Sequence, residues 1–116
     1  MAARTFIPRR GDIMWIDLDP VRGHEQAGRR PAIIVSSSFF NRKTGHAIIV
    51  PVTSKRKGYE IEVPVGTAKI DGVALTSSVR SIDWRKRRMR HADVCPQDTL
   101  TAIQGMLIAF IVDGKN

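Results

Sequence analysis

The apolar residues of this 116-residue chain fall into short runs interrupted by turn residues, and only the last run has helical spacing. Short runs rich in β-branched and aromatic side chains are typical of strands. We expect strands at residues 11–18, 31–37, 46–54 and 59–65, one or two more within 72–79 and 81–84, and another at 88–94 with a basic outward face. Five or more short strands closed by one helix predict a small, strongly curved antiparallel sheet or partly open barrel.

The predicted strands differ in how deeply they are buried. Residues 31–37 form a continuous apolar run, which indicates a strand covered on both faces. Residues 59–65 alternate instead, which predicts a half-exposed antiparallel strand. One face of that strand carries Tyr59, Ile61, Val63 and Val65, and the other carries Glu60 and Glu62. The segment 37–45 suits one helical turn that ends at Gly45.

The last segment, residues 96–112, has the period of an amphipathic helix. Pro96 and Asp98 fall in its first turn and Gly114 lies beyond its end, as is typical of helix boundaries. Its apolar stripe should lie across the sheet and consists of Leu100, Ile103, Leu107, Phe110 and Ile111. The fold class is therefore mainly β with a C-terminal helix, in one domain that spans residues 1–116.

The chain is strongly basic, with 19 Lys and Arg against 11 Asp and Glu and a formal net charge of +8. This charge favours a polyanionic partner, nucleic acid first and an anionic membrane second, although a solvated basic surface explains it equally well. The longest apolar run, residues 106–112, is too short to cross a bilayer, and the N-terminus has no secretory pattern. A single cysteine, Cys95, fits a reducing cytoplasm and a small residue at a helix entrance.

The connection RGHEQAGRRP, residues 22–31, carries more ionisable chemistry than a loop requires. HEQAG begins like the zinc motif HExxH, but position 28 is Gly, so we expect neither a metal site nor any other cofactor. Glu25 can accept a proton, while Arg29 and Arg30 offer planar donors that match phosphate oxygens. The alternative is an internal ion pair between Glu25 and an arginine that only shapes the loop.

Two further polar clusters follow. Thr53 and Ser54 end a predicted strand and precede Lys55, Arg56 and Lys57, which together can hold phosphates or simply form a solvated hairpin tip. The run WRKRRMRH begins at Trp84 and includes Arg85 and Lys86. A basic run with an aromatic residue can follow a nucleic-acid backbone, but the tryptophan can equally belong to the core.

The order of the segments RRGDIMWIDLDP, RGHEQAGRRPAIIVS, FNRKTGHAIIVPVTS, GVAL and VRSIDWR closely resembles the MazF/PemK family of toxin endoribonucleases over nearly the whole chain. The resemblance implies an SH3-like barrel of the CcdB/MazF type, a homodimer, and metal-independent cleavage of single-stranded mRNA at short sequences. It also implies a MazE-like antitoxin whose disordered tail occupies the RNA groove.

The resemblance also assigns roles. The essential arginine of the family falls on Arg30, its essential threonine on Thr53 and its loop glutamate on Glu25. The implied chemistry is attack by the 2′-hydroxyl of the RNA on the adjacent phosphate, with Glu25 as base, Arg30 stabilising charge and Thr53 donating a hydrogen bond. His24 stays an alternative base or acid, because its ordinary pKa near 6.5 suits proton transfer. The residues expected to contact RNA are Gln26, Arg29, Ser54, Lys55, Arg56, Lys57, Ser77, Ser78, Arg85 and Lys86.

One departure from the family pattern leaves functions other than an endoribonuclease open. Members commonly carry an Asp-Gln pair before the VRSID-like segment, where this chain has Leu75, Ser77 and Ser78. The acid and base proposed for the PemK branch therefore do not transfer. A non-catalytic RNA-binding module is the main alternative. A gyrase poison resembling CcdB ranks last, because the RNA-cleaving motifs are present and the IVDGKN ending lacks the Trp-Gly-Ile that CcdB uses.

Overall fold

The structure is a computed structural model that describes residues 6–18 and 29–112. Seven strands, two α-helices and two short 3₁₀ turns lie in these ranges. In chain order they are β1 (Asp12–Ile16), β2 (Arg30–Ile34), α1 (Ser38–Thr44), β3 (His46–Thr53), β4 (Glu62–Gly66), β5 (Asp71–Leu75), η1 (Thr76–Ser78), β6 (Arg80–Asp83), η2 (Trp84–Lys86), β7 (Met89–Val94) and α2 (Gln97–Val112).

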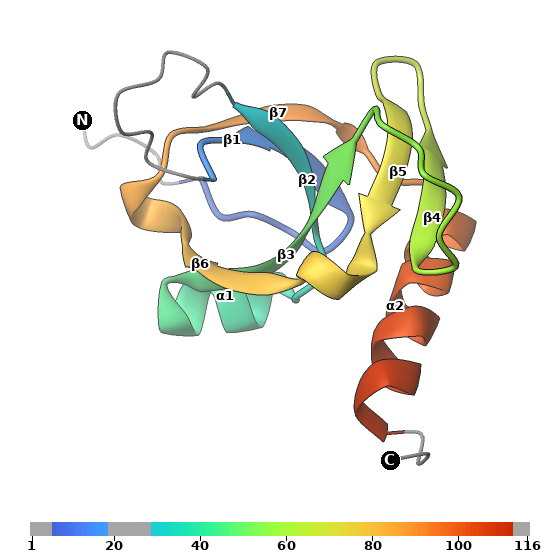
Figure 1. The fold of residues 1–116 in the computed structure, drawn as a ribbon. Helices are drawn as coiled ribbons and strands as arrows, with labels where there is room; N and C mark the ends of the chain where they lie inside the picture. Colours follow the sequence, from blue (N-terminus) through green and yellow to red (C-terminus); the bar gives the residue numbers. More distant parts are fainter. Residues whose placement is uncertain (1–5, 19–28, 113–116) are drawn as a thin grey trace, which may run out of the picture.

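All strand pairs are antiparallel, and the strands follow the order β4-β5-β3-β2-β1-β7. Strand β3 pairs with three strands: its first half pairs with β6, its last two residues pair with β5, and residues 49–51 pair with β2. The sheet therefore curls into a half-barrel, with α2 beside β4 (Figure 1). The mainly β fold with a C-terminal helix is confirmed.

Successive residues of the central strands enter two different cores. Ile33 of β2 packs in one core together with Leu100 and Ile103 of α2. Its neighbours Ala32 and Ile34 pack in the other core, which contains Trp84. The continuous apolar run therefore marks a strand buried on both faces, as the sequence predicts. Because Trp84 is only 5% exposed, the core interpretation of this tryptophan is correct.

Helix α1 supports that second core through one buried polar residue. The Ser37 hydroxyl caps the helix by accepting a hydrogen bond from the Phe40 amide, and Gly45 ends it in the left-handed conformation at φ 72°. Asn41 is fully buried, and its side-chain amide donates to the Pro8 carbonyl at 2.7 Å. The main-chain carbonyl of Asn41 accepts a hydrogen bond from the Trp84 indole at 2.9 Å. The glycine exit is confirmed, although the helix is seven residues long rather than one turn.

The strand predicted at residues 59–65 is wrong at its beginning. Strand β4 begins at Glu62, and Tyr59 is 59% exposed. The Glu62 carboxylate accepts hydrogen bonds from the amides of Lys57 and Gly58, both at 3.0 Å, while the Glu62 amide donates to the Tyr59 carbonyl. These bonds form a turn where the alternation predicts extended chain. Val63 and Val65 are buried as expected.

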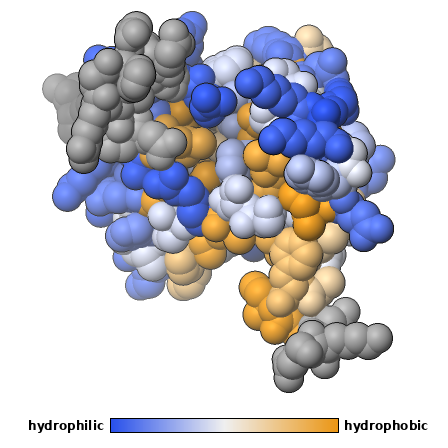
Figure 2. Space-filling view, in the orientation of Figure 1, coloured by the Kyte–Doolittle hydropathy of each residue, from blue (hydrophilic) through white to orange (hydrophobic). Residues whose placement is uncertain are grey.

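Helix α2 covers the sheet only with its first half. Leu100 and Ile103 are buried, but Phe110 is 48% and Ile111 80% exposed, so the prediction that the whole stripe lies across the sheet is wrong. The helix runs past the edge of the sheet (Figure 1), and apolar side chains cover its projecting half (Figure 2). Within the described ranges, neither helix has the length and apolar character needed to span a bilayer.

Candidate active site

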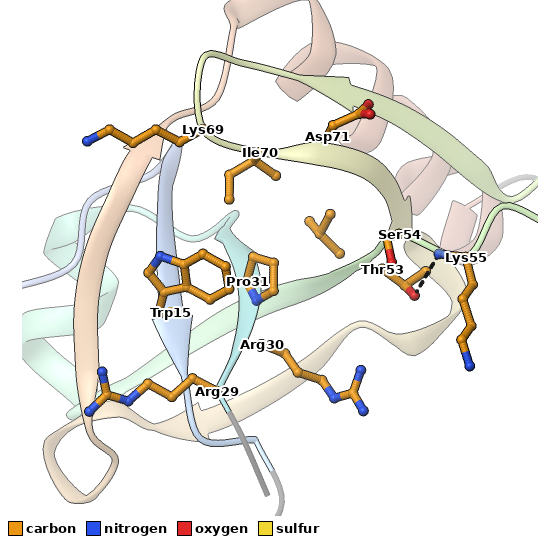
Figure 3. A pocket seen from close by; sticks show the side chains of 11 residues that line it. Trp15, Arg29, Arg30, Pro31, Thr53, Ser54, Lys55, Lys69, Ile70 and Asp71 are labelled. Carbon is orange, nitrogen blue, oxygen red and sulfur yellow. Dashed lines mark hydrogen bonds between the residues drawn. The ribbon is translucent and has the colours of Figure 1, made fainter. Parts of the chain in front are cut away.

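A cavity of about 460 Å³ opens at the mouth of the half-barrel, where β2 begins and β3 ends. Figure 3 shows Trp15 between Lys69 and Arg29 on one side of this cavity, with Thr53, Ser54 and Lys55 on the other. The lining residues are Trp15, Arg29, Arg30, Pro31, Val52, Thr53, Ser54, Lys55, Lys69, Ile70 and Asp71. We call this space the main cavity.

Strand register brings Arg30 and Thr53 to the same place. Strands β2 and β3 pair Ala32 with Pro51 and Ile33 with Val50. Continuing this register toward the mouth sets Arg30 level with Thr53, and both side chains line the main cavity. Arg30 is exposed, so its guanidinium is available to an anion in that space. Two residues that the sequence assigns to one site, 23 positions apart, are therefore neighbours in the fold.

The main chain fixes the orientation of Thr53. Its hydroxyl oxygen accepts a hydrogen bond from the Lys55 amide at 3.2 Å, shown as the dashed line in Figure 3. A hydroxyl that accepts one hydrogen bond can still donate its own proton to another acceptor. Thr53 can therefore donate one hydrogen bond to a bound oxyanion.

The three cations after Ser54 have different surroundings. Lys55 lines the main cavity, whereas Arg56 forms an ion pair with Asp71 at 2.6 Å. Lys57 lies in a neighbouring cavity of about 290 Å³, which also contains Thr53, Tyr59, Ser77 and Ser78. Thr53 lines both spaces, so they meet at its side chain. Ser77 and Ser78, which stand where family members commonly carry the Asp-Gln pair, therefore lie next to the main cavity.

The basic run that follows Trp84 lies elsewhere. The Arg85 guanidinium stacks 5.2 Å from the Trp84 ring and donates to the Arg42 carbonyl at 3.4 Å. Arg87 donates to the carbonyls of Asp17 and Leu18, so it binds the main chain that directly follows β1. Arg85 and Lys86 line neither of the two cavities described above. A role for them in RNA binding stays a prediction.

Six residues that line the main cavity were not predicted as site residues from the sequence: Trp15, Pro31, Val52, Lys69, Ile70 and Asp71. Trp15 lies between the buried Met14 and Ile16 in β1, so strand alternation could have placed it on the other face. Nothing local marks Lys69, which reaches the cavity because the sheet curls. His24, Glu25 and Gln26 lie outside the described residues. Within the described ranges, His, Cys, Asp and Glu side chains form no cluster of three that could hold a metal ion.

Cys95 is separate from this site. It is buried in the core shared with α2, and burial raises the pKa of its thiol to about 11, with a smaller contribution from the charge of Asp98. A thiol with a raised pKa is a poor nucleophile near neutral pH. Cys95 is therefore better explained as a small buried residue of the core than as a nucleophile.

Residues 9–111 match the family described as PemK-like, MazF-like toxin of type II toxin-antitoxin system. The chain belongs to the PemK/MazF toxin family. Its relatives include the endoribonuclease toxin MazF of Escherichia coli K12, which is 44% identical over 94 residues covering 80% of this chain and 85% of the relative. The Escherichia coli endoribonuclease PemK is 33% identical over 103 residues, covering 84% and 77%. The resemblance seen in the sequence is confirmed.

Solved structures of the PemK/MazF family have the same fold. The crystal structure of MazF from Deinococcus radiodurans matches with a TM-score of 0.82 and 38% identity, covering 92% of this chain and 98% of that one. A MazE-MazF structure from the same organism matches with a TM-score of 0.81 and 33% identity, covering 92% and 97%. The curled half-barrel with its C-terminal helix is the fold of MazF structures.

Proposed function

We propose that this MazF-like endoribonuclease toxin cleaves single-stranded mRNA at short sequences without a metal ion, using the main cavity as its active site. The observation that carries the proposal is the convergence of Arg30 and Thr53 at the ends of paired strands, in an open cavity lined by further cations. A guanidinium beside a hydroxyl donor suits a phosphodiester whose negative charge increases in the transition state.

The reaction requires no nucleophile from the protein. The 2′-oxygen of the RNA forms a bond to the adjacent phosphorus, and the bond from phosphorus to the 5′-oxygen breaks. The 2′-hydroxyl proton goes to a base, and a proton is delivered to the leaving 5′-oxygen. The products are a 2′,3′-cyclic phosphate and a 5′-hydroxyl. Because the substrate supplies the nucleophile, the protein must mainly bind, orient and stabilise charge.

The described residues fill two of the required roles. Arg30 places positive charge and planar donors against the non-bridging oxygens, and Thr53 donates a hydrogen bond to the same group. An arginine guanidinium holds its proton near neutral pH, so Arg30 stabilises charge rather than acting as the acid. Glu25 as base, with His24 as the alternative, completes the proposal from residues outside the described ranges.

RNA should follow the cations of the mouth. Arg29 and Lys55 line the main cavity, and Lys57 lies in the space next to it. Neutralising roughly four phosphates gives a slope of log affinity against log salt near −3 for a single strand. A slope near zero, measured with a noncleavable RNA, would remove the electrostatic part of the proposal.

The partners follow from the family. We infer a MazE-like antitoxin, as in the related Deinococcus complex, and a homodimer. The exposed apolar side chains of Ile108, Ile111 and Val112 support association with another chain, because exposed apolar patches commonly mark interfaces. We infer a cytoplasmic location from the mRNA substrate and the free thiol of Cys95.

The alternative is an RNA-binding module without turnover. Its motivation is the presence of exposed Ser77 and Ser78 beside Thr53, where family members commonly carry the Asp-Gln pair. Stable binding of RNA by the unaltered protein, without any cleavage, would favour this alternative.

The test is incubation of the pure protein with a long single-stranded RNA in excess EDTA, followed by mapping of cut sites. We expect recurring cuts at one short motif that Arg30→Ala abolishes. Arg42→Ala is the matched control, because Arg42 is an exposed arginine on α1 that does not line the main cavity. Cuts shared equally by the unaltered protein and Arg30→Ala would contradict the proposed site.

A further inference from the structure

A second basic space lies beside the main cavity. This side cavity has a volume of about 420 Å³ and is lined by Trp15, Arg29, Lys69, Arg90, His91 and Ala92. Trp15, Arg29 and Lys69 line both spaces, so the two are continuous along the mouth of the half-barrel. A chain-like ligand that occupies the main cavity can therefore continue past Trp15 toward β7.

Strand pairing sets the position of Arg90. Trp15 of β1 pairs with Pro31 on one side and with Arg90 on the other. Directly paired residues in antiparallel strands lie on the same face of the sheet. Pro31, Trp15 and Arg90 thus form a row across three strands, from the main cavity at Pro31 to the side cavity at Arg90.

The charge of the side cavity is strongly positive. Arg29, Lys69 and Arg90 are exposed, and among the described residues neither Arg29 nor Arg90 forms an ion pair with a carboxylate. His91 has a carboxylate partner, Asp12, at 3.4 Å. Exposed cations lining a concave surface attract an anionic ligand.

A local network holds Lys69 at the boundary of the two cavities. The Thr67 hydroxyl oxygen accepts from the amides of Lys69 at 3.2 Å and Ile70 at 3.0 Å, which fixes the turn between β4 and β5. The Thr67 side chain lowers the pKa of Asp93 in β7, with smaller contributions from the Val94 and Lys69 main chain and from the positive charge of Lys69. The turn that carries Lys69 is therefore tied to the strand that carries Arg90.

We propose that the side cavity is a second phosphate subsite that binds the backbone of RNA nucleotides flanking the cleaved bond, with Lys69 and Arg90 as its phosphate ligands. This inference rests on the proposed function, because it takes the ligand of the main cavity to be single-stranded RNA. Single strands carry a regularly spaced phosphate on each nucleotide, which matches cations distributed along a continuous groove. The subsite contributes affinity for longer RNA and takes no part in the chemical step.

The test compares two single variants that remove the same charge. Arg90→Gln alters the subsite at a residue that does not line the main cavity, whereas Arg42→Gln removes one arginine from α1, outside both cavities. The probes are RNAs centred on the mapped cut site, with a 2′-deoxy nucleotide at the cut to prevent cleavage. One probe extends several nucleotides on each side, and a trimmed probe keeps only the nucleotides at the cut.

The subsite variant should bind the longer probe about threefold more weakly than the α1 variant and should match the α1 variant on the trimmed probe. Its salt slope should be shallower than that of the unaltered protein by about 0.7. Its KM for a longer cleavable RNA should rise while kcat stays unchanged. Equal affinity of the two variants for the longer probe, or an equal loss on the trimmed probe, would overturn the subsite. If the unaltered protein cuts no RNA, the proposed function and the subsite that rests on it both fail. If it cuts RNA but the two variants bind the longer probe equally, only the subsite is rejected.

Discussion

Gly72 of β5 packs directly against the main chain of Thr53: a methyl group built on its α-carbon would lie 2.4 Å from the Thr53 carbonyl oxygen. No side chain fits at that distance without moving β3. Gly72→Ala should therefore displace Thr53, lower the free energy of unfolding by about 1–3 kcal/mol and reduce RNA cleavage. Urea unfolding and a cleavage assay measure the two effects.

The matched control for this substitution is Gly66→Ala. Gly66 ends β4, and a methyl group built there meets no atom within 4 Å. We expect it to leave both stability and cleavage close to those of the unaltered protein. Similar behaviour of the two alanine variants would mean that the packing of Gly72 does not position Thr53.

The Thr53 hydroxyl is tested by two substitutions of similar size. Thr53→Val keeps the shape of the side chain but removes the donor, so cleavage should fall about 10²–10³-fold at nearly unchanged RNA affinity. Thr53→Ser keeps the donor and should retain most of the activity. Equal rates for the valine and serine variants would show that the hydroxyl takes no part in the reaction.

The strands were predictable because alternation and continuous apolar runs are local signals of how a strand is buried. Ile33 and its neighbours Ala32 and Ile34 enter different cores, as the apolar run at 31–37 indicates. Tyr59 departs from its pattern because the Glu62 carboxylate binds the amides of residues 57 and 58, which alternation does not describe. Ile111 is exposed because the helix extends past the end of the sheet. The spacing of apolar residues along the helix does not indicate where the sheet ends.

The site was predictable in part. Arg30 and Thr53 were identified from the family resemblance, and the β2–β3 register explains why they meet. Lys69 and Arg90 come together only when the sheet curls and the β4–β5 turn binds Asp93. That arrangement depends on pairing between distant segments, which no local pattern records.

The buried amide of Asn41 should be important for stability but not for chemistry. Its side chain donates to the Pro8 carbonyl at 2.7 Å, and removing it would leave that carbonyl without this partner. Asn41→Ala should lower the free energy of unfolding by about 1–3 kcal/mol, measured by urea denaturation. Cleavage by the protein that remains folded should be unchanged, and a specific loss of kcat would contradict this assignment.

Burial of Cys95 gives a defined pH dependence. Its pKa rises from an ordinary value of 9.0 to about 11 in the folded protein, so the unfolded chain loses the proton first. The resulting stabilisation is complete below pH 9.0 and is lost as the pH rises to about 11. The stability difference between the unaltered protein and Cys95→Ala should therefore shrink across this range in thermal unfolding. A constant difference would show that the thiol does not ionise differently on folding.

In the proposed reaction the RNA supplies the nucleophile, while Arg30 and Thr53 stabilise the reacting phosphate. The most direct measurement replaces the single 2′-hydroxyl at the mapped cut site with hydrogen and identifies the ends by mass spectrometry. We expect cyclic phosphate and 5′-hydroxyl ends from the all-ribose RNA, and bound but uncut RNA after the replacement. Continued cleavage at the 2′-deoxy nucleotide would contradict it, because the attacking oxygen would then have to come from another source.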